Sequence, residues 1–87
     1  MFKLWSDKAW DDYLYWQSQD KKTLKKINIL IKECERTPFD GTGKPEALKH
    51  QPGNYWSRRI DEKNRLVYKV EDEQLMIASC RDHYRTK

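Results

Sequence analysis

Three β-prone segments in the last third of the chain are separated by very short polar connectors, and this spacing constrains the fold most strongly. The segments are residues 55–60, 65–70 and 75–81, and the connectors are residues 61–64 and 71–73. Connections this short join antiparallel neighbours. The sequence therefore predicts an antiparallel three-stranded meander.

The expected register of this meander gathers arginines on one face. Pairing Ile60 with Leu66 places both side chains in the core. Arg59 and Arg65 then point together to the opposite face, because side chains alternate along a strand. The last strand is apolar on both faces, and only one of its two parities brings Arg81 to the arginine face.

Two helices joined by one or two residues are expected before the meander. Ser6 can cap a helix over residues 7–18, and Asp20 can cap a second helix. The second helix should stop near Arg36, because Pro38 disfavours helical angles at the residue before it. So short a junction predicts an antiparallel helical hairpin.

Each helix has an apolar face that predicts how it packs. The face of the second helix repeats every 3.6 residues and consists of Leu24, Ile27, Leu30, Ile31 and Cys34. In the first helix, Trp10, Tyr13 and Leu14 follow helical spacing, and we assign them to the core rather than to a base-stacking surface. Residues 2–5 alternate and predict a further short strand, whereas residues 37–54 are rich in Gly and Pro and are expected to form an ordered loop.

The length and composition fit a single α+β domain over residues 1–87, with two N-terminal helices packed on a twisted antiparallel sheet. Eighty-seven residues supply one hydrophobic core, and four Trp, five Tyr and two Phe can fill it. We expect no signal peptide and no membrane span, because no long apolar segment is present, and hence a cytoplasmic location. We also expect no metal and no other cofactor, because Cys34 and Cys80 lack metal-ligand spacing.

Positive charge is concentrated where the sheet is expected. Lys and Arg number 18 against 14 Asp and Glu, and the formal net charge is +4. The last third is rich in arginine, with Arg58, Arg59, Arg65, Arg81 and Arg85, and it ends in Lys87. Guanidinium groups bind phosphate in a bidentate manner, which favours a polyanion such as RNA. A solvated surface of mixed charge fits the composition equally well.

Two further side chains could take part in acid–base chemistry on RNA. Glu46 lies close to Lys49 and His50 in the Gly/Pro-rich loop, where cations favour an ionised carboxylate, although a surface ion pair is an equal alternative. His83, followed by Tyr84, lies near arginines at the end of the last strand. Metal-independent RNA cleavage requires a base, an acid and a cation, and these residue types supply all three.

Short blocks over the whole chain resemble one family, the YoeB (Txe/YoeB) toxins of bacterial toxin–antitoxin pairs, within the RelE superfamily. The blocks are Trp10-Asp11-Asp12-Tyr13, Tyr15-Trp16, Lys25-Lys26-Ile27-Asn28, Thr37-Pro38-Phe39, Gly43-Lys44-Pro45-Glu46, Leu48-Lys49-His50, Trp56-Ser57-Arg58-Arg59-Ile60, Arg65-Leu66-Val67-Tyr68, Cys80-Arg81 and His83-Tyr84. The resemblance implies a microbial-ribonuclease-like fold and an endoribonuclease toxin that inhibits translation by cleaving mRNA in the ribosomal A site. It also implies a homodimer, neutralised by a YefM-type antitoxin, that meets DNA only through the antitoxin complex.

The same resemblance implies roles for individual residues. Glu46 corresponds to the general base, His83 to the general acid and Arg65 to the phosphate-binding arginine. With Tyr84 these are the catalytic candidates, and the RNA-binding candidates are Lys49, His50, Arg58, Arg59 and Arg81. Two features depart from the family pattern: Lys63 stands where an acidic residue is common, and residues 85–87 follow the His-Tyr pair.

Two other functions compete with the nuclease. A non-catalytic inhibitor would block translation by occupying the ribosome or its RNA. A DNA-binding regulator is disfavoured, because the sequence shows no helix-turn-helix with a polar recognition helix.

Overall fold

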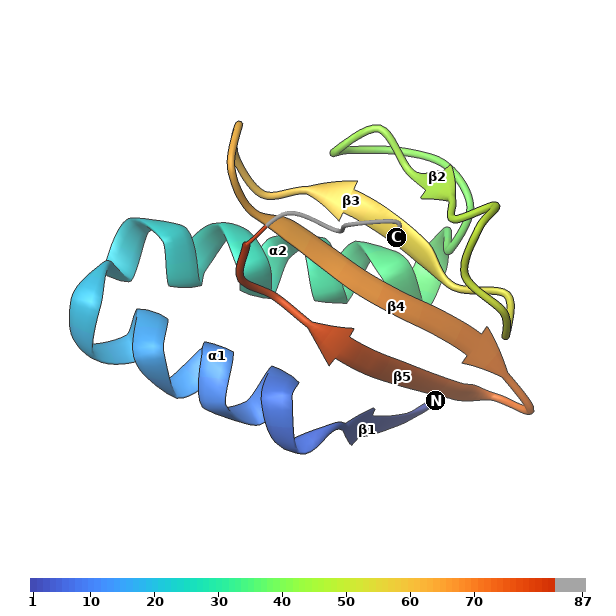
Figure 1. Cartoon of the computed structure of the whole chain (residues 1–87), viewed down its shortest axis with the longest axis horizontal. Coiled ribbons are helices and arrows are strands. Elements are labelled where there is room, and N and C mark those ends of the chain that lie inside the picture. The colour runs from blue at the N-terminus through green and yellow to red at the C-terminus, as the bar shows by residue number, and fades with distance from the viewer. Residues whose placement is uncertain (83–87) are drawn as a thin grey trace.

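The computed structural model describes residues 1–82 and shows two helices packed on one face of a five-stranded sheet (Figure 1). The elements are β1 (Phe2–Trp5), α1 (Asp7–Gln19), α2 (Lys21–Arg36), β2 (Glu46–Ala47), β3 (Trp56–Arg59), β4 (Arg65–Glu71) and β5 (Gln74–Ser79). The strand order is β1-β5-β4-β3-β2, with β1 parallel to β5 and the other neighbours antiparallel. The α+β architecture and the meander predicted from the sequence are confirmed.

Side-chain caps determine where the helices begin. The Ser6 Oγ accepts a hydrogen bond from the Ala9 N–H at 3.0 Å, and the Asp20 Oδ1 accepts from the N–H groups of Lys22 and Thr23. Both caps satisfy backbone donors that have no partner within the helix. The predicted helix starts are thus confirmed, as is the end of α2 at Arg36.

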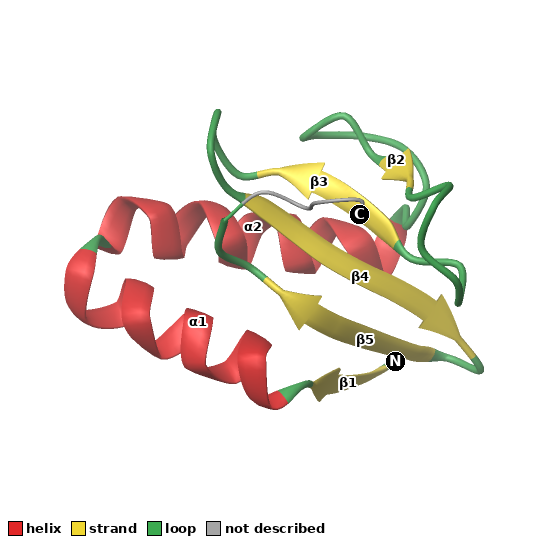
Figure 2. Cartoon of the chain, in the orientation of Figure 1, coloured by secondary structure: helices red, strands yellow, loops and turns green. Residues whose placement is uncertain are grey.

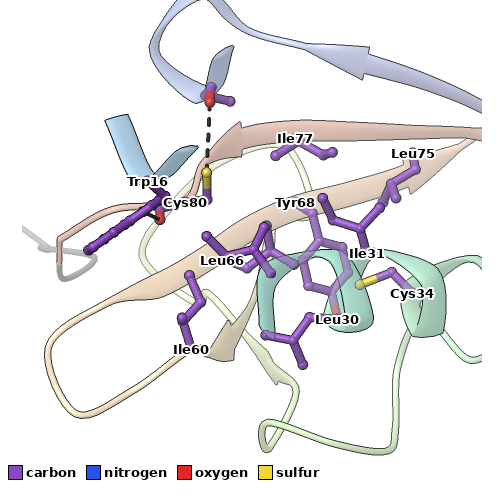
Figure 3. Packing of buried hydrophobic residues seen from close by; sticks show 12 residues of the cluster. Trp16, Leu30, Ile31, Cys34, Ile60, Leu66, Tyr68, Leu75, Ile77 and Cys80 are labelled. Atoms are coloured by element: carbon purple, nitrogen blue, oxygen red, sulfur yellow. Dashed lines mark hydrogen bonds between the residues drawn. The ribbon is translucent and has the colours of Figure 1, made fainter. Parts of the chain in front are cut away.

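The helices and the sheet share one core (Figure 3). The predicted face of α2 is confirmed, because Ile27, Leu30, Ile31 and Cys34 are buried. From the sheet, buried side chains include Leu66, Tyr68, Leu75 and Ile77. Cys80 is buried as well, and its Sγ donates to the Ala9 carbonyl at 3.7 Å. Burial raises the pKa of the Cys34 thiol to about 11 and that of Cys80 to about 12.

The predicted core face of α1 is wrong for Trp10 and Leu14 and is confirmed for Tyr13, which is partly buried and packs against the core. Trp10 is 47% exposed and Leu14 is 43% exposed, whereas Ala9, Asp12 and Trp16 are the buried residues of this helix. The rings of Trp5, Trp10 and Tyr13 instead form a partly exposed cluster, with centroids 4.9–5.8 Å apart.

Helix α1 is thus rotated about its axis relative to the prediction, so that Asp12 and Trp16 face the sheet. Two polar contacts to the residue that follows β5 account for this orientation. The Asp12 carboxylate accepts from the backbone N–H of Cys80 at 3.0 Å. The Trp16 Nε1 donates to the carbonyl of Cys80 at 2.8 Å. Both groups satisfy buried backbone of a residue far along the chain, which would otherwise remain without a partner.

The register of the β3–β4 hairpin differs by two residues from the prediction. Leu66 is opposite Arg58 rather than Ile60, and Arg59 is opposite Arg65. The Ile60 N–H instead donates to the Asn64 carbonyl and belongs to the turn. Because side chains alternate, a shift of two residues leaves every side chain on its predicted face.

The stretch 37–54 contains a strand that the sequence did not reveal. Glu46 and Ala47 form β2 and pair with Ser57 and Trp56 of β3. Two residues are too few for a periodic pattern, so this strand was predicted as loop. None of the helices in the described chain is long and apolar enough to span a membrane.

Candidate active site on the outer face of the sheet

The strand pairing brings one carboxylate and two guanidinium groups to the same sheet face. Glu46 is directly opposite Ser57, and Arg59, two residues further along β3, is directly opposite Arg65. Directly opposed residues, and residues two apart on a strand, lie on one face. Since the helices cover the other face (Figure 2), we call the face of Glu46, Ser57, Arg59 and Arg65 the outer face.

Arg65 is held by the turn that precedes its strand. Its Nη1 donates to the carbonyls of Asp61 at 2.7 Å, Asn64 at 3.1 Å and Glu62 at 3.3 Å. Within residues 1–82 no hydrogen bond uses Nε or Nη2 of Arg65. The guanidinium is therefore anchored through one nitrogen and can offer the other two to an anion.

Glu46 borders a hollow at the edge of the sheet. The hollow has a volume of about 300 Å³ and is lined by Glu46, Ala47, Leu48, Lys49 and His50. The Leu48 N–H donates to the Tyr55 carbonyl at 2.9 Å, which holds this segment against β3. Neighbouring strands are about 4.8 Å apart, so long side chains on β2 and β3 can reach one substrate group. Glu46, Lys49 and His50 are therefore brought together, as the sequence predicted.

The prediction that Arg58 contacts RNA is wrong. Its side chain is fully buried on the helix side of the sheet, where Nη1 is 2.8 Å from the Glu33 carboxylate. A buried guanidinium is tolerated only when charged and polar partners surround it. Arg58 is thus part of the interior, between Ser57 and Arg59 in the chain.

Arg81 is also displaced from the predicted site. The chain leaves β5 after Ser79, and the Arg81 guanidinium lies 3.5 Å from the centroid of the Tyr15 ring on α1. This cation–π contact places Arg81 beside the helix. The alternation of side chains along β5 ends with the strand at Ser79, so it does not carry Arg81 to the face of Arg59 and Arg65.

His83 and Tyr84 lie outside the described residues, but the backbone just before them is anchored. The Asp82 N–H donates to the Asn64 side-chain oxygen at 2.7 Å, and the Arg65 N–H donates to the Asp82 carbonyl at 3.1 Å. Asp82 has a φ of 73°. The last described residue is thus fixed beside Arg65, at one end of the outer face.

Asn64 was overlooked in the sequence, although a local signal was present. The Asp61 Oδ1 accepts from the N–H groups of Lys63 and Asn64, and the Asp61 carboxylate also accepts from the Asn64 amide. An Asp three residues before an Asn between two strands is typical of an Asx turn. Lys63, the departure from the family pattern, is an exposed residue of this turn.

No group of three or more His, Cys, Asp or Glu side chains in residues 1–82 is arranged to hold a metal ion. The chemistry that the described side chains offer is that of Glu46, Lys49 and His50 around one hollow, with Arg59 and Arg65 on the same sheet face as Glu46. A carboxylate can accept a proton, and the guanidinium groups can neutralise a phosphate.

Comparison with known proteins gives one consistent result. Residues 5–84 match the family described as "YoeB-like toxin of bacterial type II toxin-antitoxin system". The chain is 62% identical over 81 residues to Toxin YoeB of Escherichia coli K12, which covers 93% of this chain and 96% of that protein.

Solved structures agree with this result. The YoeB dimer from Staphylococcus aureus superimposes with a TM-score of 0.90 at 47% identity, covering 97% of this chain and 98% of that one. The heterotetrameric YoeB–YefM toxin–antitoxin complex from Staphylococcus aureus gives a TM-score of 0.87, with the same identity and coverage.

Proposed function

The chain belongs to the YoeB-like toxins of bacterial type II toxin–antitoxin systems, and on this premise we propose that it inhibits translation by cleaving mRNA in the ribosomal A site. One observation carries the proposal: Glu46 shares the outer face of the sheet with Arg59 and Arg65. A carboxylate beside two guanidinium groups fits proton abstraction next to a phosphodiester. DNA-binding regulators of the helix-turn-helix class instead use a polar recognition helix, and this group of residues lies on a sheet.

The reaction we propose is an internal transesterification. Glu46 takes the proton of a ribose 2′-hydroxyl, and the 2′-oxygen attacks the adjacent phosphorus. Arg65, assisted by Arg59, stabilises the additional negative charge of the phosphorane. The bond to the 5′-oxygen breaks as His83 donates a proton to that oxygen. The products are a 2′,3′-cyclic phosphate, or the 3′-phosphate formed by its hydrolysis, and a free 5′-hydroxyl.

The remaining site residues bind the RNA around the scissile phosphate. Lys49 and His50 line the hollow beside Glu46. In the proposal they contact neighbouring phosphates or bases, and Tyr84 assists His83. No step of the proposed reaction uses a metal ion bound by the protein.

The proposed partners follow from the relatives. The Staphylococcus aureus protein is known as a dimer and in a complex with YefM. We infer that this chain forms a homodimer, and that a YefM-type antitoxin neutralises it and provides any contact with DNA. An activity on translated mRNA places the protein in the cytoplasm.

Primer extension on a translated message tests the proposal. The wild type should give discrete cuts, and the downstream fragments should carry a free 5′-hydroxyl. Glu46→Ala should reduce the cleavage rate by about 10²- to 10⁴-fold, the usual contribution of general acid–base catalysis. Glu73→Gln is a matched control, because Glu73 is an exposed acidic residue in the β4–β5 turn.

Three results would count against this function. Downstream fragments with a 5′-phosphate would contradict the metal-independent mechanism, because a metal-activated water that attacks the phosphorus leaves such an end. Full activity of the double variant Glu46→Ala/His83→Ala would contradict the assignment of base and acid. Intact mRNA during complete translational arrest would instead support an inhibitor that acts by occupying the ribosome.

A further inference from the structure

We propose that Arg58 is a positioning residue for RNA cleavage, because from the interior it holds the loop that delivers Glu46 to the outer face. This inference rests on the proposed role of Glu46 as the base. Arg58 itself cannot reach RNA, since its side chain is fully buried. Its effect on the reaction must therefore pass through the residues that it binds.

The Arg58 side chain donates hydrogen bonds to five acceptors. Nε donates to the Tyr68 hydroxyl at 3.2 Å. The two terminal nitrogens donate to the Glu33 carboxylate and to the carbonyls of Thr37, Asp40 and Thr42. A guanidinium has five N–H groups in a fixed planar arrangement, so five acceptors can be held at once. Three of these acceptors are backbone carbonyls of one loop.

Two neighbouring contacts complete the anchoring of this loop. The Tyr68 hydroxyl donates to the Pro38 carbonyl at 2.6 Å. Glu33, on α2, accepts from both the N–H and the hydroxyl of Thr42. Residues 37–42 are thus held by the network of Arg58, Glu33 and Tyr68. Phe39, in the same loop, is 52% exposed and packs on Trp56.

The chain segment that connects this network to Glu46 is short and closely packed against β3. The Arg59 N–H donates to the Gly43 carbonyl at 2.7 Å. Gly43 has a φ of 87°, and a Cβ there would lie 3.1 Å from the Cβ of Arg58. Only Lys44 and Pro45 then separate Gly43 from Glu46, and the ring of Pro45 restricts its own φ. The position of Glu46 therefore depends on where the loop leaves Arg58.

Strand β3 links the two sides of this arrangement. Ser57 pairs with Glu46, Arg58 points inward to the loop, and Arg59 points outward to the proposed phosphate site. Simple stabilisation does not require a charge here, because an apolar side chain of similar volume would avoid the desolvation penalty. An apolar side chain could not bind three carbonyl groups of one loop. The structure therefore assigns Arg58 to loop placement.

Arg58→Lys is the most informative substitution. It retains the positive charge but replaces a planar group of five donors with a single ammonium, which cannot span the five acceptors. We expect kcat for RNA cleavage to fall by about 10²-fold, the effect of a small misplacement of a catalytic group. KM should change much less, because Arg59, Arg65 and Lys49 remain on the surface. Arg36→Lys, at the exposed end of α2, is the matched control.

Single-turnover cleavage by a double-mutant cycle tests whether Arg58 acts through Glu46. In the Glu46→Ala background, Arg58→Lys should cause little further loss, because the group that it positions is already absent. Amide hydrogen exchange gives a second readout, independent of RNA. Arg58→Lys should accelerate exchange at Thr42, Leu48 and Arg59, whose N–H groups donate to Glu33, Tyr55 and Gly43, and leave the β4–β5 ladder protected.

The outcomes separate this inference from the proposed function. An equal loss in the wild-type and Glu46→Ala backgrounds, or faster exchange over the whole sheet, overturns the positioning role and leaves the nuclease proposal intact. Full activity of Glu46→Ala overturns both. If Arg58→Lys does not fold, Glu33→Gln replaces it, because Glu33 is partly exposed and glutamine preserves its shape. The same selective exchange and the same dependence on Glu46 are then expected.

Discussion

Arg59 and Arg65 are directly opposed across β3 and β4, so two guanidinium groups project from the same part of the outer face. Like charges in directly opposed positions destabilise a sheet, and a bound anion relieves their repulsion. The pairing is therefore unfavourable for the free protein and useful for a protein that binds phosphate. It also gives the first of five predictions.

Inorganic pyrophosphate should raise the Tm of the wild type more than that of Arg59→Gln. At ten times the dissociation constant, binding to the folded state alone contributes about 1.4 kcal/mol. Differential scanning fluorimetry at constant ionic strength measures the difference, with Arg36→Gln as the control cation. Equal shifts for the wild type and Arg59→Gln would show that the paired arginines do not form an anion site.

Trp16→Ala should destabilise the protein far more than Trp10→Ala. Trp16 is buried and donates to the Cys80 carbonyl, so its removal should lower the free energy of unfolding by about 3–5 kcal/mol. Trp10 is nearly half exposed and mainly contacts two other rings, so about 1 kcal/mol is expected. Urea denaturation at one protein concentration compares them. Equal losses would contradict the observed rotation of α1.

Acid should weaken the anchoring of the loop through Glu33. The Thr42 N–H, which donates to Glu33, lowers the pKa of this carboxyl below its ordinary value of 4.5, and Arg58 adds to the effect. A lowered folded-state pKa contributes stability that is present above pH 4.5 and is lost as the pH falls through the folded-state value. In urea denaturation from pH 7 to pH 3, Glu33→Gln should therefore lose less stability than the wild type. Parallel curves would exclude a contribution of Glu33.

The two cysteines should be inert in the folded protein. Cys34 and Cys80 are fully buried, and burial raises the pKa of both thiols above 10, as described above. The thiolate is the reactive form, so a disulfide reagent such as DTNB should label neither residue at pH 8 until urea unfolds the chain. Rapid labelling without urea would contradict their burial.

Asn64→Ala should reduce cleavage without a large loss of stability. The Asn64 side chain holds the backbone N–H of Asp82, the residue that precedes the proposed acid His83. Loss of this contact should slow single-turnover cleavage by roughly tenfold, which is less than direct removal of an acid. Faster amide exchange at Arg65, which donates to Asp82, should accompany the loss. Glu62→Ala, an exposed change in the same turn, should affect neither quantity.

Much of the fold was predictable because it depends on local rules. Caps at Ser6 and Asp20, the stripe of α2 and the strand alternation each involve residues a few positions apart. The alternation of side chains also predicts, from the sequence alone, that Arg58 lies on the same face of its strand as Ile60, which is the core face. The prediction that Arg58 binds RNA rested on the abundance of arginine and did not take this alternation into account. The buried position of Arg58 agrees with the alternation.

For the candidate site, the sequence suggested which residue types could cooperate but not how they are held. Glu46 was expected near Lys49 and His50, and these residues line one hollow. The two-residue strand that aligns Glu46 with Ser57 left no periodic signal. The roles of Glu46 and His83 stay predictions, which the variants above test.

The sequence by itself determined the helices, three strands of the meander and the face of each side chain in the β3–β4 hairpin, because these follow from backbone geometry over neighbouring residues. Tertiary structure decided the hairpin register, the rotation of α1 and the partners that surround Arg58 in the interior. In each case the local pattern did not determine which residues meet. The choice was made by contacts between distant segments: Asp12 and Trp16 with Cys80, and Arg58 with Glu33 and the loop around it. Buried polar groups must find partners, and only the folded chain brings those partners within reach.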